Sequence, residues 1–254
     1  GVCNHSYHYL TLCVKYVYTN ILKMDRESEP ELMIKKSQVQ AYCAADFSLG
    51  ENNLIKFISN YLKINNINLS RDDLIVDLGC GPGNISERLS ERWPDVNVLG
   101  IDGSQEMIKE AESRISKNKI KNRYRNLNYL CSDIREISSQ NLFSKKKITL
   151  LVSNSLIHHI NHLDNFFKFI INLSNKETIN FHKDLIRPKN EKIALKLKDN
   201  CSQKYSDILT NDYYASLKAS YRKNEVQEKL LEFNLKSMNV IEESEEYLIV
   251  YGNV

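Results

Sequence analysis

Cysteine pairs at metal-binding or redox spacing are missing from this chain. It contains six cysteines in 254 residues, and no two of them form a CxxC pair. This scatter argues against zinc ribbons and thioredoxin-like chemistry. Reduced thiols are the simpler interpretation, so we expect a cytoplasmic protein. The six are Cys3, Cys13, Cys43, Cys80, Cys131 and Cys201.

Long hydrophobic runs are also missing, because no apolar stretch approaches the ~20 residues of a membrane span. We therefore expect no membrane partner. Residues 1–24 lack an apolar core followed by a small-residue cleavage site, which disfavours a secretory signal. A myristoylation signal fails as well, since His5 stands where Ser or Thr is needed after Gly1. We interpret residues 1–24 as a variable N-terminal extension.

Neither sign of charge dominates, since 35 Lys and Arg residues face 32 Asp and Glu residues, for a net charge of +3. A dedicated nucleic-acid binder usually concentrates its basic residues in a stripe, whereas the densest run here is the lysine triplet 145–147. We interpret that run as a solvated loop and expect no nucleic-acid partner. With 42% hydrophobic and 26% charged residues, the composition fits one globular domain, or one domain with an appendage.

Glycine and proline are scarce, at eight and four residues, so element boundaries are inferred from hydrophobic periodicity. Apolar runs predict strands that alternate with helices, which indicates a parallel sheet with right-handed crossovers. The last two strands lie too close for a crossover helix and predict a hairpin that adds one antiparallel strand at or near the edge. The expected strands are 74–78, 96–101, 127–131, 148–153, 178–186, 235–241 and 245–251. The expected helices are 29–48, 53–64, one ending near 93, one capped by Ser104, 163–173, most of 188–220, and 224–233.

The segment 76–84, VDLGCGPGN, follows a predicted buried strand and opens a helix. Its glycines let the backbone turn tightly and approach a ligand without Cβ clashes. The spacing is GxGxG rather than the GxGxxG of dinucleotide-binding folds, and Asp77 would repel a pyrophosphate, so the pattern favours a zwitterionic or cationic ligand. Asp102 ends the next strand, where an acid holds ribose hydroxyls. The alternative, a helix-capping Asp, is weaker because Ser104 already serves as the cap.

These motifs resemble those of the class I methyltransferases, which use S-adenosylmethionine as methyl donor. LIVDLGCGPGNIS is similar to the first motif of that family, VLGIDGSQEMI to the second, CSDI to the third and LLVSNSLIHHI to the fourth. The resemblance covers residues 74–160 closely and the rest of the chain more loosely. It implies S-adenosylmethionine as cofactor, with Gly79, Gly81 and Gly83 along its methionine portion, Asp77 near its amino group, Asp102, Gly103, Ser104 and Met107 at the ribose, Asp133 and Ile134 at the adenine, and Asn154 near the amino acid moiety.

The expected fold class is α/β, with a doubly wound, mostly parallel seven-stranded sheet, a C-terminal antiparallel hairpin and N-terminal helices. After the extension 1–24 we expect a helical lid at 25–70 and a Rossmann-like methyltransferase domain at 71–254, with a helical insertion at 187–224. Two further stretches, EPELM…AYCAADFS before the domain and DLIRP at the fifth strand, are similar to a bacterial branch of this family.

The acceptor of the methyl group is expected at the ends of the fourth and fifth strands. His158 and His159 are the candidate general bases there, and the alternative is that one packs or caps while the other is solvated. Adjacent residues point in different directions, so at most one of them is expected to face the methyl group. Further candidate acceptor-binding residues are Tyr42 and Phe47 as a lid, Ser155, Arg187, Tyr213 and Tyr214. For Arg187 an ion pair with Asp184 or another acid is the alternative, and for the aromatic residues it is ordinary packing.

We expect no metal site, because the two adjacent histidines would need a third ligand, and His162 and Asp164 fit no standard zinc spacing. The leading function is S-adenosylmethionine-dependent methyl transfer to oxygen or nitrogen of a small-molecule or natural-product acceptor. Methylation of RNA or another macromolecule is the alternative, although the fourth motif lacks the Asn/Asp-Pro-Pro-aromatic run of base-methylating enzymes. A non-catalytic S-adenosylmethionine-binding partner protein is a further alternative, and a dehydrogenase comes last because GxGxxG is absent. The oligomeric state is left open.

Overall fold

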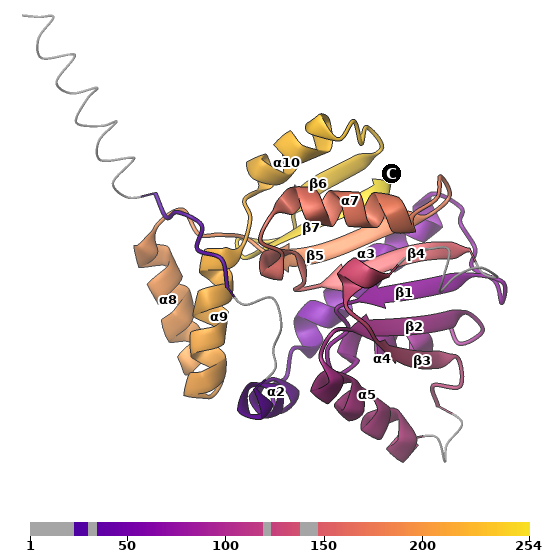
Figure 1. Cartoon of the computed structure of the whole chain (residues 1–254), viewed down its shortest axis with the longest axis horizontal. Helices are drawn as coiled ribbons and strands as arrows, with labels where there is room; N and C mark the ends of the chain where they lie inside the picture. The colour runs from indigo at the N-terminus through magenta and orange to yellow at the C-terminus, as the bar shows by residue number, and fades with distance from the viewer. Residues whose placement is uncertain (1–22, 30–34, 119–122, 138–146) are drawn as a thin grey trace, which may run out of the picture.

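The computed structural model describes residues 23–29, 35–118, 123–137 and 147–254 (Figure 1). Most of the expected N-terminal extension, residues 30–34 of the first expected helix, and two of the three lysines at 145–147 lie outside the described residues. Within the described part of the chain, no helix combines the length and the apolar character needed to cross a membrane.

A seven-stranded sheet forms the centre of the fold, with the strand order β3-β2-β1-β4-β5-β7-β6. The pairs from β3 to β5 are parallel, while β7 runs antiparallel to both β5 and β6. The expected fold class is confirmed, and the C-terminal hairpin places its antiparallel strand next to the edge. The bounds are β1 Leu74–Leu78, β2 Asn97–Asp102, β3 Leu127–Cys131, β4 Ile148–Asn154, β5 Ile179–Leu185, β6 Met238–Glu242 and β7 Tyr247–Asn253.

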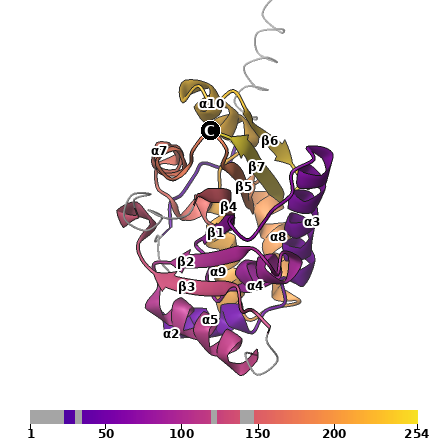
Figure 2. The ribbon, with the colours of Figure 1, turned by 90° about the vertical axis from the view of Figure 1, so that its right-hand side faces the viewer.

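Helices cover both faces of this sheet, and Figure 2 shows α3 and α7 on opposite sides of it. Alternate residues of β1 explain the arrangement, because successive side chains of a strand point to opposite faces. Ile75 shares a hydrophobic core with Leu54 and Leu89, whereas Val76 shares the other core with Phe166 and Val226. The helices of the first face are α3 Ser48–Ile64, α4 Asn84–Arg92 and α5 Gln105–Asn118, and those of the second are α7 Leu163–Leu173 and α10 Lys223–Glu232.

Three further helices, α2 Lys36–Cys43, α8 Glu191–Ser202 and α9 Asp207–Ala219, gather at one end of the sheet (Figure 1). The helices α8 and α9 begin at side-chain caps, since Asn190 Oδ1 accepts from Ile193 N over 3.0 Å and Ser206 Oγ accepts from Leu209 N over 3.4 Å. These helices cover the end of the sheet at which the cavity described below opens.

Two helix boundaries differ from the sequence-based prediction. The segment expected to be one helix over 29–48 is divided, because α2 ends at Cys43 and α3 already begins at Ser48 rather than near residue 53. Asp46 Oδ1 accepts a hydrogen bond from Ser48 N over 2.9 Å and so supports the earlier start. The apolar periodicity of this helix begins only at Leu54, and periodicity alone therefore misses its polar first turn.

Candidate cofactor and acceptor site

Three glycines turn the chain between β1 and α4. Gly79, Gly81 and Gly83 have φ values of +63°, +52° and +93°, in the left-handed region that favours glycine. A Cβ atom at Gly79 would lie 2.7 Å from Leu156 Cδ1, and one at Gly83 would collide with the hydroxyl of Tyr129. A Cβ atom at Gly81 would meet nothing within 4 Å. The turn is therefore packed tightly at both ends and leaves the backbone of Gly81 open.

Asp102, at the end of β2, is fastened to this glycine turn. Its Oδ2 accepts a hydrogen bond from Gly81 N over 2.9 Å, and its Oδ1 accepts one from Ser104 N over 2.7 Å. Burial raises the pKa of Asp102, and the two hydrogen bonds oppose that rise. Because a carboxylate has about four acceptor positions, both oxygens can still accept from a ligand hydroxyl. Ser104 Oγ accepts from Met107 N over 3.4 Å, so Ser104 caps α5 as expected.

Asp77 lies within β1 and is 1% exposed. Ser86 Oγ donates to its Oδ2 over 2.6 Å. Burial raises the pKa of Asp77 to about 7, and the charge of nearby Asp102 adds to the rise while the hydrogen bond from Ser86 opposes it. A carboxylate in this position gains free energy from a cationic partner, because opposite charge favours its ionised form.

A cavity of about 1130 Å³ opens at the carboxyl ends of β1 to β5, where ligands bind in open α/β sheets. The structure brings most of the residues singled out from the sequence together around this one space. Those that line it are Tyr42, Phe47, Asp77, Gly79, Gly81, Asp102, Gly103, Ser104, Met107, Asp133, Ile134, Asn154, Ser155, His158, His159 and Tyr213.

Three of the expected site residues do not line the cavity. Gly83 packs against Tyr129 inside the turn, and the hydroxyl of Tyr214 donates to Glu191 on the outer side of α9. The third is Arg187, which is 4% exposed and is not among the residues around the cavity.

Arg187 is part of a buried structural network. Its Nη2 lies 2.5 Å from Glu225 Oε1, its Nη1 donates to Ser220 O over 2.7 Å, and its Nε donates to Met24 O over 3.2 Å. The guanidinium thus joins the N-terminal segment to the start of α10. This placement supports the structural alternative, an ion pair, with Glu225 as the partner instead of Asp184.

At the expected adenine end of the cavity, Asp133 already forms an ion pair with Arg135. Its Oδ1 accepts from Arg135 N over 2.9 Å, and its Oδ2 lies 2.5 Å from Arg135 Nη2. The side-chain hydrogen bond with Arg135 accounts for the lowered pKa of Asp133, and partial burial opposes it. An adenine amino group at this position would share the carboxylate with Arg135, while Ile134 packs on the hydrophobic core beside it.

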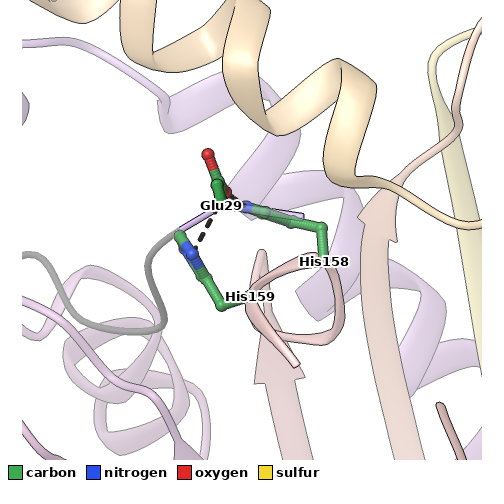
Figure 3. Close-up of side chains that lie close together, drawn as sticks. All are labelled: Glu29, His158 and His159. Atoms are coloured by element: carbon green, nitrogen blue, oxygen red, sulfur yellow. Dashed lines mark ion pairs between the residues drawn. The ribbon is translucent and has the colours of Figure 1, made fainter. Parts of the chain in front are cut away.

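The two adjacent histidines converge on one glutamate from the N-terminal segment (Figure 3). Glu29 Oε1 lies 3.4 Å from His158 Nε2 and 3.1 Å from His159 Nδ1. On its other side, His158 Nδ1 lies 2.5 Å from Asp184 Oδ1 at the end of β5. Both rings line the cavity, with centroids 4.2 Å apart, and both belong to the short 3₁₀ helix Ile157–His159. We call Glu29, His158 and His159 the histidine–glutamate cluster.

Charge in this cluster is strongly coupled. Burial disfavours the imidazolium form of His158, but Asp184 and Glu29 outweigh burial and raise its pKa. Burial likewise disfavours the charged forms of Asp184 and Glu29, and the histidines nevertheless hold the pKa values of both carboxyls below their usual range. The cluster therefore favours a positive charge between two buried carboxylates.

A short N-terminal segment, residues 23–29, delivers Glu29 to the histidines; we call it the strap. Arg26 fixes it, since its guanidinium donates to Ala219 O over 2.6 Å, to His158 O over 3.2 Å and to Ile160 O over 3.1 Å. The same group lies 4.1 Å from the ring centroid of Tyr221. A further hydrogen bond, from Nη1 to Asn161 O over 3.0 Å, fixes the same side chain. Arg26 thus ties the strap to the end of α9 and to the loop that carries the histidines.

Sequence reasoning did not assign Glu29 or Asp184 to the site. Both lie in the two stretches EPELM and DLIRP that carried the weaker part of the family resemblance. That resemblance was the available signal, because neither residue has a catalytic or metal-binding spacing to its neighbours. Their meeting with His158 depends on the path of the strap, which the apolar pattern does not reveal.

Comparison with known proteins agrees with this architecture. Residues 75–176 match the sequence profile of a family described as a methyltransferase domain. This segment, which runs from β1 to the loop after α7, is similar to methyltransferase domains.

Curated relatives match this chain over a short segment. Trans-aconitate 2-methyltransferase of Rhodopseudomonas palustris (strain HaA2) is 51% identical over 45 residues, 18% of this chain and 18% of that protein. The enzyme of the same name from Escherichia coli O157:H7 (strain EC4115 / EHEC) is 49% identical over 47 residues, 18% of this chain and 19% of that protein. The matched segment thus spans less than a fifth of the length of these relatives.

Solved structures are similar over most of the methyltransferase fold. The plantazolicin methyltransferase BpumL, in complex with a pentazolic desmethylPZN analog and SAH, has a TM-score of 0.65 at 16% identity and covers 86% of this chain and 90% of its own. A SAM-dependent methyltransferase from Aquifex aeolicus has a TM-score of 0.58 at 15% identity, over 86% and 98% of the two chains. At these identities the similarity shows the fold.

S-adenosylmethionine is the cofactor that the motif resemblance implies, and the residues at the glycine turn fit it. The backbone of Gly81 is open to the cavity, as a close approach by the ligand requires. Both oxygens of Asp102 keep acceptor positions for hydroxyls. The buried carboxylate of Asp77 suits a ligand that carries positive charge on its sulfonium and amino groups.

Proposed function

We propose that this protein transfers the methyl group of S-adenosylmethionine to an oxygen or nitrogen atom of a small-molecule or natural-product acceptor. One observation carries the proposal: a single cavity extends from the glycine turn to His158, His159 and the face of α9. Cofactor and acceptor can therefore lie side by side in one cavity, which is the requirement for direct transfer.

On the cofactor side, the chain supplies binding and orientation. Asp102 is proposed to hold the ribose hydroxyls, Gly79 and Gly81 to lie along the methionine portion, and Asp77 to offset its positive charge. Gly103, Ser104 and Met107 line the ribose side, Asp133 and Ile134 the adenine side, and Asn154 the amino acid side. When bound, the cofactor supplies an activated methyl group whose departure leaves a neutral thioether, so proximity and alignment can provide most of the rate.

The acceptor side of the cavity is formed by elements outside the central fold. Residues spaced at i, i+3, i+4 and i+7 along α9 line it, namely Leu209, Asp212, Tyr213 and Ser216, which is one face of a helix. The rings of Tyr42 and Phe47 lie 4.9 Å apart, and Phe47 lies 5.7 Å from Tyr205. This arrangement supports a lid in which Tyr42 and Phe47, from the expected helical lid at 25–70, meet Tyr205 of the insertion at 187–224. The rest of the expected lid, α3, packs on the face of the sheet.

The charge of the cavity favours a neutral or amine-bearing acceptor. Carboxylate side chains outnumber Lys and Arg among its lining residues. Asp212 Oδ2 is buried and has no hydrogen-bond partner in the described chain, and Lys183 Nζ is paired with Glu243 at 3.1 Å. A tricarboxylate would be repelled. The carboxylates are Asp46, Glu51, Asp77, Asp102, Asp133, Asp212, Glu243 and Glu246, and the cations are Arg135, Lys168, Lys183 and Lys204.

The reacting atom of the acceptor is proposed to face His158 and His159, beside Asn154 and Ser155. An acceptor that loses a proton during methylation needs a polar group there to assist its removal. His159 is the more accessible of the two, with 24% of its side chain exposed against 3% for His158.

The test is a methylation assay of the full chain with S-adenosylmethionine and a panel of acceptors, read by mass spectrometry for a gain of one methyl group. The panel includes phenols, primary amines, azole peptides with a free N-terminus, and trans-aconitate. We expect methylated product and demethylated cofactor in equal amounts with at least one amine or hydroxyl acceptor, and none with trans-aconitate. Preferential methylation of trans-aconitate would contradict the charge argument, and tight binding of NAD without S-adenosylmethionine binding would contradict the proposal as a whole.

A further inference from the structure

In the histidine–glutamate cluster, unshared electron pairs on nitrogen and oxygen would face each other unless a cation lies between them. An ionised carboxylate only accepts hydrogen bonds. His158 Nδ1, which faces Asp184, therefore carries a proton. The remaining nitrogen, Nε2, then faces Glu29 Oε1 at 3.4 Å. A lone pair on Nε2 would oppose the lone pairs of that oxygen, so a cation, either a proton or a metal ion, belongs between the two atoms.

Asp184 holds His158 in the orientation that metal-binding histidines usually have. Its Oδ1 lies 2.5 Å from His158 Nδ1, and its Oδ2 accepts from the backbone N–H groups of Ile157 and His158 over 2.5 and 3.2 Å. A carboxylate behind one ring nitrogen fixes the tautomer and makes the other nitrogen a better ligand. Here that other nitrogen is the one that points at Glu29.

His159 supplies a second donor to the same point. Its Nδ1 is buried, lies 3.1 Å from Glu29 Oε1, and has no hydrogen-bond partner of good geometry among the described residues. The three donor atoms lie within 4.8 Å of one another. Two ligands about 2.1 Å from a tetrahedral ion lie about 3.4 Å apart, so the two distances to Glu29 Oε1 already match metal spacing.

The strap and α9 fix the position of the Glu29 carboxylate. Arg26 anchors the strap through four carbonyl oxygens, and Ser216 Oγ donates to Glu29 Oε1 over 3.1 Å. Glu29 is thereby ordered before any ligand arrives, which lowers the entropic cost of binding.

We propose that Glu29, His158 and His159 bind one divalent transition-metal ion, such as Zn²⁺, in the wall of the acceptor cavity. Two histidines and one glutamate are the donor set of catalytic zinc sites that keep an open position. The sequence predicted no metal because neither His162 nor Asp164 has suitable spacing, and the structure brings the missing third ligand from the strap. An acceptor hydroxyl or a water in the open position would have its pKa lowered by the ion.

The test uses the full chain, stripped with EDTA and dialysed into metal-free buffer. Co²⁺ is titrated while its visible absorption is recorded, and Zn²⁺ is then added in competition. We expect saturation at one equivalent and displacement by Zn²⁺. Glu29→Gln and His159→Ala should each bind the metal at least about 10–100-fold more weakly. The matched controls, His162→Ala and Glu27→Gln, change exposed residues nearby and should leave the affinity unchanged.

Because neither cofactor nor acceptor is present, this result is independent of the proposed methyl transfer. Absence of saturable Co²⁺ and Zn²⁺ binding, or equal binding by wild type and both cluster variants, overturns the site and leaves an imidazolium between two carboxylates. Should a variant not fold, X-ray absorption of the Co²⁺-loaded wild type decides the matter. Two imidazole ligands support the site, and one or none contradicts it.

Discussion

The carboxylate of Asp102 and the backbone N–H of Gly81 are joined by a hydrogen bond of 2.9 Å. This bond connects the end of β2 to the turn that follows β1. The proposed ribose-binding group and the proposed methionine-binding backbone are therefore positioned as one unit, and neither can move without the other.

Replacing Asp102 by Ala should weaken binding of S-adenosylhomocysteine about 10–100-fold or more in calorimetry. The variant loses the charged acceptor for the ribose hydroxyls, and each such hydrogen bond contributes about 1.5–3 kcal/mol. Asp95→Ala is the matched control, because Asp95 is 72% exposed and pairs only with exposed Arg71. An unchanged affinity in Asp102→Ala would remove this residue from the cofactor site.

Asp77→Asn should make the stability of the cofactor-free protein less dependent on pH. The pKa of Asp77 is raised to about 7 when folded, above the ordinary value of about 3.9. The folded state therefore binds this proton more tightly, and the wild type loses stability as pH rises from about 4 to about 7, by an amount on the order of 2–4 kcal/mol. Asn has no proton to lose, so the advantage of the variant in urea unfolding should grow over that range.

Asp77→Asn should also bind S-adenosylmethionine more weakly, because the positive charge of the cofactor loses the ionised carboxylate of Asp77 as its partner. Ser86→Ala removes the hydrogen bond to Asp77 without removing the charge, and serves as the comparison. A constant stability difference between wild type and Asp77→Asn from pH 4 to pH 8 would contradict the raised pKa.

Short apolar runs predicted all seven strands, and the signal is strongest for the central ones, because a strand buried on both faces must be apolar at nearly every position. Leu74–Leu78 shows this, since all five of its residues are buried. Asp77 and Asp102 were predicted near the cofactor for a similarly local reason, as each lies at or next to the end of a strand that a glycine follows. Local sequence patterns therefore predicted the fold. They also predicted the cofactor half of the cavity, which the strand ends of the central sheet form.

The acceptor half was less accessible to prediction, because it depends on segments that meet across long stretches of sequence. Glu29 reaches His158 only through the strap, and Arg187 was assigned to the acceptor because its partner, Glu225, lies far along the chain. A charged residue at a strand end can pair with protein or with ligand, and sequence spacing does not distinguish the two.

Arg187→Ala should destabilise the protein by roughly 2–4 kcal/mol in urea unfolding. Breaking a fully buried ion pair costs about 3–5 kcal/mol, and the cost is smaller here because Glu225 is 33% exposed. Arg71→Ala, which removes an exposed ion pair, should change stability by less than about 1 kcal/mol. The folded Arg187→Ala protein should keep the KM of the wild type for its acceptor, and a large rise in KM at unchanged stability would return Arg187 to the acceptor site.

His159→Ala should lower kcat by about 10²–10⁴-fold for an acceptor that loses a proton during methylation. Its affinity for S-adenosylhomocysteine should stay close to that of wild type, because the proposed cofactor contacts lie at the ends of β1 to β3 and at Asn154, and none of them is assigned to His159. His162→Ala, an exposed neighbour, should retain full turnover. Full turnover in His159→Ala as well would mean that this histidine has a structural role alone.

Asp212→Asn should discriminate between acceptors by their charge. Asp212 Oδ1 accepts from Gln38 Nε2 over 3.0 Å and keeps α9 against α2, while Oδ2 is buried without a hydrogen-bond partner in the described chain. An acceptor amine is the partner that this oxygen lacks, and a charge-assisted hydrogen bond to it contributes about 1.5–3 kcal/mol.

The variant should therefore raise KM about 10–100-fold for an amine-bearing acceptor and leave KM for a neutral hydroxyl acceptor nearly unchanged. Asp207→Asn alters an exposed carboxylate at the start of the same helix and controls for the loss of one negative charge on α9. Because Asn retains an oxygen for Gln38, the position of α9 should be preserved, and S-adenosylhomocysteine affinity reports whether it is. Equal effects on both acceptors at constant cofactor affinity would show that Asp212 shapes the cavity without recognising an amine.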